Sequence, residues 1–495
     1  MELSVKFLDW SAGVPIVMLN NKTAEKIGIH TRDRVLIKTL SKKPRESLAI
    51  TDIAKKIVGE DEIAVSSEIK ERMGLASGQK VKIALAQAPE SLSIIKKKLD
   101  GAHLSEKEIL QIVNDIVNNS LSEPEIALFI SAMYEQGTTM KETIALIKSI
   151  LNTGKKLSFK SRLVADKHSI GGIAGRTTPI VVSICASTGI IMPKTSSRAI
   201  TTPAGTADAL ETLAKVDISL EEVKKIVDKV GACIVWGGTN LGLVPADSKL
   251  IRVEKQLNID PEAQLLSSIM AKKLAAGSNY IVIHIPYGKT AKVTKSGALK
   301  LKKKFDYLGK YFHKKLKCIL TKNKGPIGNG IGPALEMIDV IKVLKREDNC
   351  YLLEQNSLEI SAAILELAGK AKPGKGVDMA KKILDSGKAL EKFKEIIKAQ
   401  KGHLNGLKPA RFKKDILSNS SGKILEIDNK KINYLARLAG CPVDHFAGIY
   451  LYSHQGDRIK KGDKIMTIYS EAKSRLVQAV EYSKKEKSIL ILKHS

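Results

Sequence analysis

Two consecutive units of strand, loop and helix lie between Leu163 and Ala209, and they constrain the fold more than any other stretch of the chain. In the first unit the apolar residues 163–165 lead into the polar, glycine-rich segment 166–178, and Pro179 opens an apolar helix. In the second unit the apolar residues 190–193 lead into the small-residue loop 194–206. Loops that follow the carboxyl ends of parallel strands meet at one edge of a sheet, where ligands bind. The pattern therefore predicts an α/β domain with a ligand site at that edge.

Both loops carry the residue types that bind phosphate. Glycines allow the backbone to approach an anion closely, and successive N–H groups at such a turn form a nest for it. A single loop of this kind is usually just a turn, and neither loop has the spacing of a Walker A or dinucleotide-binding motif. The two loops together favour a phosphate site, with the candidate side chains Lys167, Ser169, Thr178, Ser196 and Arg198.

These loops also carry a resemblance to a known family. Residues 166–172, DKHSIGG, are similar to the signature of the pyrimidine-nucleoside phosphorylases, which include thymidine phosphorylase. Residues 197–202, SRAITT, and 204–208, AGTAD, resemble the archaeal branch of that family, which acts on AMP. The resemblance extends from about Leu92 to the C-terminus. It implies a pentosyltransferase that converts AMP and phosphate into adenine and ribose 1,5-bisphosphate in nucleotide salvage, with CMP and UMP as further substrates.

The resemblance implies a role for individual residues as well. The positions that hold inorganic phosphate are Lys167, Ser169, Thr178, Ser196 and Thr206. The positions that contact AMP are Gly171, Ser197, Arg198, Ala199, Ile200, Thr201, Thr202, Thr206, Ser268 and Lys292. Lys272 matches a further base contact, His168 matches a histidine beside the sugar and base, and Asp260 matches the proposed proton donor. Asp260 and His168 are thus the expected catalytic residues, and no metal or redox cofactor is expected besides the co-substrate phosphate.

The chemistry of this reaction suits the residues that the resemblance selects. Adenine leaves more readily when N7 is protonated, and the carboxylic acid of Asp260 could supply that proton if its pKa were raised in the complex. Lys292 and Arg198 could neutralise the 5′-phosphate of the substrate. Without the resemblance, Asp260 before Pro261 is predicted to be a helix N-cap. Asp260, Ser268 and Lys272 would then share one face of that helix.

The net charge of +30 leaves a second class of function open. Such a charge is typical of nucleic-acid-binding proteins, so an RNA-binding protein is one alternative. The lysines are spread along the whole chain, however, and only 8 Phe and 2 Trp are present to stack on bases. We therefore favour a solvated basic surface that collects phosphorylated substrates, and we expect no nucleic-acid partner. Within the enzymes, a pyrimidine-nucleoside phosphorylase and, less well supported, a phosphoribosyltransferase similar to the anthranilate enzyme are the alternatives.

Four regions are predicted, and the first contains an internal repeat. In residues 1–84, Gly28 and Gly74 each follow a short helical segment and precede a β-branched strand, so two copies could close a small β-barrel resembling a double-psi barrel. No catalytic constellation occurs there, and we expect a role in assembly. Residues 85–158, joined by roughly 248–278, form a helical subdomain in which Ser105, Ser122 and Thr139 open capping boxes.

The two remaining regions are the central and the C-terminal ones. Residues 159–425 are predicted to form the central α/β domain with a largely parallel sheet. Residues 426–495 form a strand-rich α+β subdomain, in which the segment 456–463 resembles the hairpin of biotinyl and lipoyl barrel-sandwich domains. A modifiable lysine in the usual context is missing, so a carrier role is not expected.

Composition and sequence order indicate a cytoplasmic protein. No apolar run reaches the length of about 20 residues that spans a membrane, and the first residues lack the order of a signal peptide. The 5 cysteines are scattered without a CxxC pair, so metal binding and redox chemistry are not expected. The expected partners are the nucleotide, phosphate and further copies of the chain, in a homo-oligomer with a dimer core and possible higher assembly.

Overall fold

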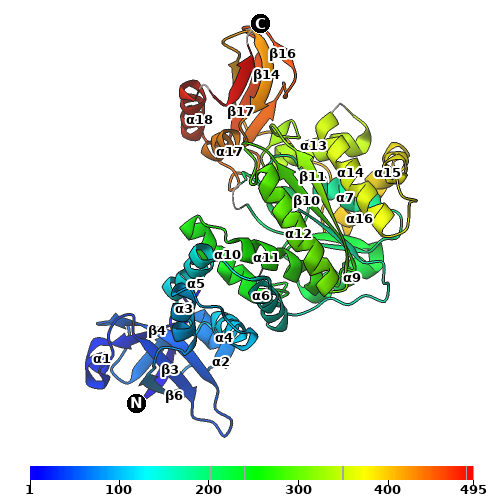
Figure 1. Cartoon of the computed structure of the whole chain (residues 1–495). Helices are drawn as coiled ribbons and strands as arrows, with labels where there is room; N and C mark the ends of the chain where they lie inside the picture. The colour runs from blue at the N-terminus through cyan, green and yellow to red at the C-terminus, as the bar shows by residue number, and fades with distance from the viewer. Residues whose placement is uncertain (200–201, 239, 348–349, 487, 494–495) are drawn as a thin grey trace. The chain divides into compact units, whose positions relative to one another are not determined.

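The computed structural model describes residues 1–199, 202–238, 240–347, 350–486 and 488–493. The chain divides into two compact units (Figure 1). The first consists of Met1–Thr153 and Ala246–Ser267, and the second of Gly154–Pro245 and Ser268–Ser495. Each unit is described by itself.

The first unit begins with a closed β-barrel, in the strand order β1-β5-β2-β4-β3-β6. Its elements are β1 (Glu2–Phe7), β2 (Ile16–Asn20), α1 (Asn21–Ile27), β3 (Arg34–Thr39), β4 (Glu46–Ala54), β5 (Glu62–Val65), α2 (Ser67–Met73) and β6 (Lys80–Leu85). Alternate side chains of the strands point inward, so that Val35 and Ile37 are fully buried. Gly28 and Gly74 end the two helices with φ of 65° and 57°, which confirms the helix ends predicted from the repeat.

The rest of the first unit is helical. Its helices are α3 (Ser91–Leu99), α4 (Glu106–Val117), α5 (Glu123–Gln136), α6 (Met140–Asn152), most of α10 (Pro245–Leu257) and the first part of α11 (Glu262–Ala275). All three predicted capping boxes are confirmed, at the starts of α4, α5 and α6. In the third, the Thr139 backbone N–H donates to Glu142 Oε2 over 2.8 Å. These caps satisfy N–H groups that the first turn of a helix leaves without partners.

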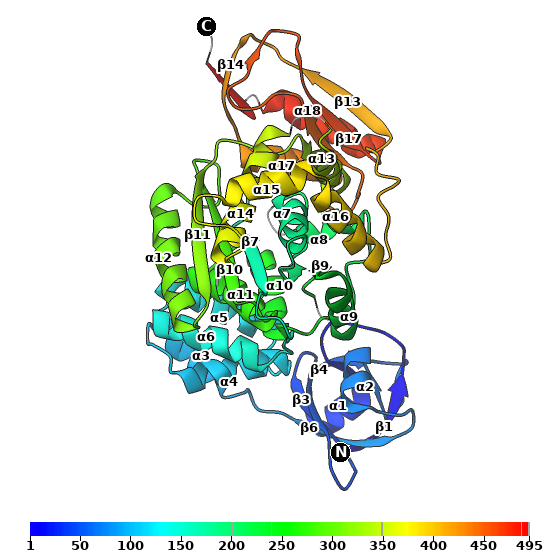
Figure 2. The same ribbon diagram turned by 90° about the vertical axis from the view of Figure 1, so that its right-hand side faces the viewer.

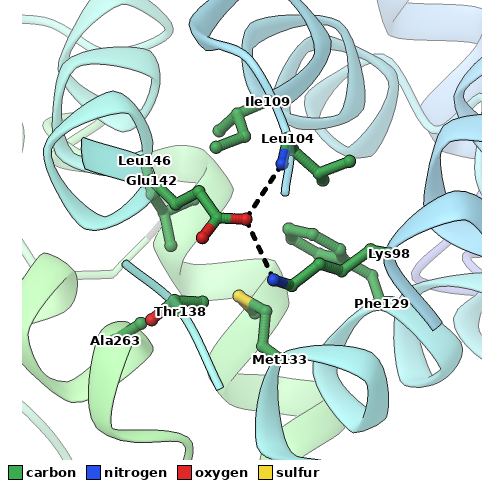
Figure 3. A pocket seen from close by; sticks show the side chains of 9 residues that line it. All are labelled: Lys98, Leu104, Ile109, Phe129, Met133, Thr138, Glu142, Leu146 and Ala263. Atoms are coloured by element: carbon green, nitrogen blue, oxygen red, sulfur yellow. Dashed lines mark hydrogen bonds and ion pairs between the residues drawn. The ribbon is translucent and has the colours of Figure 1, made fainter. Parts of the chain in front are cut away.

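A buried ion pair joins α3 to α6 in this helical part, beside a small pocket (Figure 3). Lys98 Nζ donates to Glu142 Oε1 over 2.9 Å, and the Leu104 N–H donates to the same oxygen over 3.0 Å. The side chains of Lys98 and Glu142 are 1% and 3% exposed. The other pocket residues are mostly apolar, such as Phe129 and Met133. Each carboxylate oxygen of Glu142 therefore has protein donors, since Oε2 belongs to the capping box.

The second unit contains the central sheet, whose described strand pairs are parallel. The strands are β7 (Ala165–Ser169), β8 (Met192–Ser196), β9 (Ala232–Trp236), β10 (Tyr280–Tyr287) and β11 (Lys315–Lys322). They form the orders β11-β10-β7 and β8-β9, and a bridge between Val164 and Ile191 joins the two. This confirms the parallel α/β domain that the alternation of strands and helices predicts.

Helices cover this sheet. They are α7 (Thr177–Ala186), α8 (Thr206–Glu211), α9 (Leu220–Val230), α12 (Lys295–Tyr311), α13 (Pro333–Lys345), α14 (Tyr351–Leu367), α15 (Gly376–Asp385) and α16 (Lys388–Ala399). Figure 2 shows α12 and α14 on opposite sides of β10 and β11. The main core lies between the strands and α7, α13, α14 and α16, and its apolar members include Ile180, Leu353 and Phe393.

The C-terminal part of the second unit consists of two small antiparallel sheets and two helices. One sheet has the order β12-β15-β17-β13, from β12 (Gly330–Ile331), β15 (Gly448–Leu451), β17 (Lys464–Ser470) and β13 (Phe412–Leu417). The other has the order β16-β14-β18, from β16 (Arg458–Ile459), β14 (Gly422–Ile427) and β18 (Leu490–Lys493). The helices are α17 (Asn429–Leu438) and α18 (Lys473–Lys485). Ala174, from the predicted phosphate loop, belongs to the apolar core of this part.

Two local expectations are wrong. Residues 166–169 and 194–196, expected in loops, are the last residues of β7 and β8. Their polarity does not end the strands, because their backbones pair with apolar strands; His168 lies opposite Ile283, and Lys194 opposite Ile234. The ligand-binding side chains predicted there therefore stand on strand ends, which hold them more rigidly than loops would.

The second wrong expectation concerns Asp260, which is not a helix N-cap. Helix α11 begins at Glu262, and the Leu265 N–H donates to the Pro261 carbonyl over 3.0 Å. Pro261 therefore supplies the first acceptor of the helix and takes the N-cap position itself. Asp260 lies outside the helix, so helical periodicity does not place it on the face of Ser268 and Lys272.

Candidate functional site

A cluster of buried charges lies at the carboxyl ends of β7 and β8. Asp166 Oδ2 accepts from Lys273 Nζ over 2.7 Å, and Asp166 Oδ1 lies 3.6 Å from Lys194 Nζ. The three side chains are at most 6% exposed. Burial lowers the pKa of Lys273 to about 7, although Asp166 opposes that shift. One carboxylate thus faces two lysines from α11 and β8.

Lys167 adds a third buried cation to this cluster. Its Nζ donates to Ser169 Oγ over 2.9 Å and to Thr177 Oγ1 over 2.8 Å, and both partners are neutral hydroxyls. Burial, followed by the charges of Lys194 and Arg176, lowers the pKa of Lys167 well below its usual value. A bound anion would relieve this concentration of positive charge, because it would add the countercharge that hydroxyl groups do not supply.

Two histidines lie beside Lys167, and both are neutral at pH 7. Burial, followed by the charges of the nearby lysines, lowers the pKa of His168 well below its usual value. His284 on β10 has its Nδ1 3.3 Å from Ser169 Oγ and its Nε2 3.0 Å from Thr321 Oγ1. Burial lowers the pKa of His284 to about 3. His168 can therefore exchange hydrogen bonds with a ligand here, but it does not hold a second proton to donate.

The backbone of the first loop depends on its glycines. Gly172 and Gly175 have φ of 99° and 115°, which other residues rarely adopt. A Cβ on Gly175 would lie 2.5 Å from Ile327 Cγ1, and one on Gly172 would lie 3.3 Å from the backbone nitrogen of Lys292. The structure thus brings Lys292, a predicted AMP contact, next to the loop that contains Gly171.

Arg176 connects the first loop to the second. Its guanidinium donates to the Thr206 hydroxyl over 3.3 Å, to the Ala204 carbonyl over 2.7 Å and to Glu336 Oε2 over 2.6 Å. Burial raises the pKa of Glu336, against the lowering effect of Arg176. Thr206, a predicted phosphate contact at the start of α8, is therefore linked through Arg176 to the start of α7, where Thr178 lies.

The second loop contains both unpartnered hydroxyls and an engaged arginine. Thr195 Oγ1 and Ser196 Oγ are buried and have no hydrogen-bond partner within the described part of the chain. Arg198 donates to Asp208 Oδ1 over 3.1 Å and to Glu211 Oε1 over 2.8 Å, and Glu211 is the main cause that raises its pKa. The Ser196 hydroxyl is thus available to hydrogen-bond a ligand, whereas the Arg198 guanidinium already pairs with two carboxylates.

The remaining predicted contacts of this loop are only partly described. Asp208 Oδ2 accepts from the backbone N–H groups of Ala199 and Gly205 over 2.7 and 2.8 Å, which holds the two ends of the loop together. Thr202 donates its hydroxyl to the Ala204 carbonyl over 2.8 Å. Ser197 follows β8 directly. Ile200 and Thr201 lie outside the described residues.

The predicted base contacts lie together on α11. Lys272 Nζ donates to Ser268 Oγ over 2.8 Å, as their spacing of one helical turn predicts. Asp260 belongs to the first unit and Ser268 to the second, and the role expected for Asp260 stays a prediction.

Several residues of the site were missed by sequence reasoning. Thr177, rather than Thr178, contacts Lys167. Arg176, Lys273 and His284 also belong to the cluster around the two loops. A sequence signal existed for Arg176 and Thr177, which lie in the glycine-rich segment itself. No sequence signal existed for His284, because it lies within an apolar strand that the sequence predicts to be part of the hydrophobic core.

Among the described residues no helix is long and apolar enough to span a membrane. In the same part of the chain no group of three or more His, Cys, Asp and Glu side chains has the arrangement of a metal site.

Models of three protein domains match successive parts of the chain. The glycosyl transferase family helical bundle domain matches residues 92–154, and the a/b domain of that family matches 161–390. The pyrimidine nucleoside phosphorylase C-terminal domain matches residues 423–490. Anthranilate phosphoribosyltransferase from Thermus thermophilus has a similar structure, with a TM-score of 0.52 and 18% identity over 62% of this chain and 99% of that one. This likeness shows a shared fold.

Curated relatives match almost the full length of the chain. AMP phosphorylase of Methanococcoides burtonii is 40% identical over 99% of this chain and 97% of its own. AMP phosphorylase of Thermococcus kodakarensis is 40% identical over 99% of this chain and 98% of its own. Because the helical bundle, the a/b domain and the C-terminal domain are all matched, and these relatives are similar over almost the full chain, the chain belongs to the AMP phosphorylase family of glycosyl transferases.

Proposed function

We propose that the protein catalyses the phosphorolysis of nucleoside 5′-monophosphates, converting AMP and phosphate into adenine and ribose 1,5-bisphosphate. CMP and UMP are further substrates in this proposal. The observation that carries it is the buried cluster in which Lys194 and Lys273 share the Asp166 carboxylate, while Lys167 beside them donates to the hydroxyl groups of Ser169 and Thr177. An anion would balance the positive charge of this cluster, and the relatives that are 40% identical to the chain are named AMP phosphorylase.

Inorganic phosphate binds at the ends of β7 and β8 in this proposal. Lys167 supplies the charge, and hydroxyl groups at the strand ends and at the starts of the following helices supply hydrogen bonds: Ser169, Thr178, Ser196 and Thr206. The buried, unpartnered Ser196 Oγ supports this assignment, since a phosphate oxygen would provide its missing partner. Holding phosphate and nucleotide together supplies much of the rate, about 7–11 kcal/mol of the barrier in favourable cases.

The chemical step exchanges one bond at the anomeric carbon for another. The C1′–N9 bond of AMP breaks while a phosphate oxygen bonds to C1′, through a transition state in which the ribose carries positive charge. Asp260 donates a proton to N7 of the leaving adenine and recovers it from solvent. His168 hydrogen-bonds the sugar or base in its neutral form, which its lowered pKa supports.

Recognition of AMP rests on residues around the first and second loops. Lys292 is our candidate for the 5′-phosphate, because its backbone lies against Gly172 in the first loop. Arg198 is engaged by Asp208 and Glu211, and we assign it to holding the second loop in shape. The remaining AMP contacts of the proposal are Gly171, Ser197, Ala199, Ile200, Thr201, Thr202 and Thr206. Ser268 and Lys272, joined on α11, contact the base.

The proposal includes the setting of the enzyme. It uses no metal or redox cofactor, it acts in nucleotide salvage, and it works in the cytoplasm, where the five cysteines would stay reduced. The barrel of residues 1–84, which we infer to be double-psi-like, serves assembly of a homo-oligomer built on a dimer core. Light scattering of the chain without residues 1–84 tests this role, and an unchanged number of subunits would contradict it.

The decisive assay measures base release from AMP, CMP, UMP, adenosine and thymidine, each with and without inorganic phosphate. The proposal expects release only with phosphate, fast from the nucleotides and at most slow from adenosine. Release from thymidine instead would assign the chain to the pyrimidine-nucleoside reaction. No release from any substrate would direct attention to the basic surface, for which salt-sensitive RNA binding is the test.

A further inference from the structure

One face of α17 contacts three ligand loops of the central domain. Asn429, Asn433 and Arg437 are spaced by four residues, so they form a single stripe along this helix. Figures 1 and 2 show α17 between the C-terminal strands and the central domain. The stripe belongs to the second unit, as do the loops it contacts.

Each member of the stripe bonds a different loop. Asn433 Nδ2 donates to the Gly172 carbonyl of the first loop over 3.2 Å. Asn429 Nδ2 donates over 3.0 Å to the hydroxyl of Thr290, in the loop that carries Lys292. Arg437 donates to the Thr202 carbonyl of the second loop over 3.5 Å. A helix outside the central sheet thus contacts all the loops to which the proposed function assigns phosphate groups.

The bond to Gly172 also fixes the direction of a neighbouring N–H. In a trans peptide the carbonyl and the following N–H point in opposite directions. With the Gly172 carbonyl held by α17, the Ile173 N–H points to the other side of the loop. Ala174, next along the chain, is completely buried in the apolar core of the C-terminal part. The loop is therefore anchored to the C-terminal part by both a hydrogen bond and apolar packing.

Asn433 has a second unusual property. It is 5% exposed, and its Oδ1 has no hydrogen-bond partner within the described part of the chain. A buried amide oxygen without a partner is unfavourable in a residue that serves packing alone. The same helix side therefore combines a donor that is used on the loop with an acceptor that remains available.

We propose that the stripe Asn429–Asn433–Arg437 is a positioning surface, through which the C-terminal part sets the loops in their phosphate-binding geometry, and that Asn433 is its central positioning residue. The inference rests on the proposed function for its kinetic consequences. The expected effect on phosphate binding is independent of the proposed function, because phosphate binding can be measured without turnover.

The test compares Asn433→Ala and Asn433→Asp with the native full-length chain. Both variants should raise the KM for phosphate at least tenfold at pH 8, with a smaller change in the KM for AMP, because alanine and an ionised aspartate cannot donate to the Gly172 carbonyl. Burial beside the Gly172 carbonyl should raise the pKa of the carboxyl introduced in Asn433→Asp, so that it becomes protonated and can donate again as the pH falls from 8 to 5. Its activity relative to the native protein should therefore rise, whereas that of Asn433→Ala should stay constant.

Lys430→Gln on the exposed side of α17 is the matched control and should leave both KM values unchanged. A second readout is the rise in Tm caused by inorganic phosphate, which should shrink in both Asn433 variants. If the native protein cleaves no nucleotide but shows this difference in Tm, the proposed function fails and the positioning role stands. If both variants lose thermal stability but keep the native KM for phosphate and the native phosphate effect on Tm, the positioning role is refuted.

Discussion

The helical part of the first unit and the central domain of the second both bury lysine, but they neutralise it differently. In the helical part Lys98 pairs with Glu142, whose two carboxylate oxygens also accept from the Leu104 and Thr139 backbone N–H groups. In the central domain the partners of Lys167 among the described residues are the hydroxyl groups of Ser169 and Thr177. There, Lys194 and Lys273 share Asp166.

The comparison separates a structural use of buried charge from a functional one. An ion pair whose charges balance and whose hydrogen bonds are complete has no free charge or hydrogen-bonding group for a ligand. Removal of one partner leaves the other as an unpaired buried charge. A cluster with excess positive charge is costly until an anion binds. Fold stability should therefore depend on the first site, whereas phosphate affinity and turnover should depend on the second.

The largest expected effect is the loss of turnover in Lys167→Met. Removal of the buried cation should lower kcat/KM for phosphate by about 10³-fold, or about 4 kcal/mol, as expected for a charged group that contacts the transferred phosphate. The Tm without phosphate should not fall, because methionine relieves an unbalanced charge. Steady-state kinetics and thermal melts measure the two effects, and a fall in Tm with normal kinetics would reverse our distinction between the two sites.

The matching variant in the helical part, Lys98→Met, should do the opposite. It leaves Glu142 buried without its cation, which should cost about 3 kcal/mol of the free energy of unfolding. The value of kcat/KM should stay within about twofold of the native value at temperatures where the protein remains folded. Urea denaturation followed by circular dichroism measures the loss, and Lys96→Met on the exposed side of α3 is the control.

Asp260→Asn tests whether the first unit contributes chemistry as well as packing. Loss of the proton donor should lower kcat for AMP by about 10²-fold and leave the KM for phosphate unchanged, as expected for general acid catalysis. Unchanged turnover of AMP would remove Asp260 from the mechanism.

Lys292→Ala separates the two phosphate groups within the second unit. The variant should lower kcat/KM for AMP about tenfold, corresponding to one charge-assisted hydrogen bond, and should leave the slow reaction with adenosine unchanged. Parallel assays with the two substrates provide the measurement. Equal losses for both would exclude a specific contact with the 5′-phosphate.

The smallest expected effect is the dependence of stability on pH. The central domain and the helical part of the first unit should lose stability in different pH ranges. His284 has its pKa lowered to about 3, so below pH 6.5 the unfolded chain takes up a proton that the folded chain does not, and stability falls. Between pH 7 and 5.5 this contributes about 1.2 kcal/mol of lost stability.

The pKa of Glu142, by contrast, is lowered from 4.5 by hydrogen bonds that outweigh its burial. Its contribution is present above pH 4.5 and is lost only as the pH falls further. Hydrogen exchange at pH 7 and 5.5 should therefore show loss of protection in β7 and β10 before α3 and α6. In His284→Gln the difference between the two regions should shrink.

Local features of the fold were predictable because local interactions determine them. The capping boxes at Ser105, Ser122 and Thr139 and the left-handed glycines after α1 and α2 each depend on residues within a few positions of one another. The expectation for Asp260 failed at this same level, since a proline can supply the first helical acceptor itself.

The candidate site was predictable only in part. Glycines, hydroxyl groups and cations in the sequence indicated its two loops. Around the ends of β7 and β8 lie four of the predicted residues: Lys167, Ser169, Ser196 and Thr206. Arg198 also lies there, but its partners Asp208 and Glu211 decide that its charge is already balanced. The spacing of residues along the chain carries no information about such pairing.

The sequence alone thus determined the alternation of strands and helices in the central domain, the capped helices of the first unit, and the family to which the two loops are similar. The tertiary structure decided how the charges balance. Asp166 meets Lys273 from 107 positions further along the chain, and His284 meets Ser169 from 115 positions away, through the parallel register of β7 with β10. Coulomb energy and hydrogen bonding depend on distances in space, which only the packed sheet and its helices set.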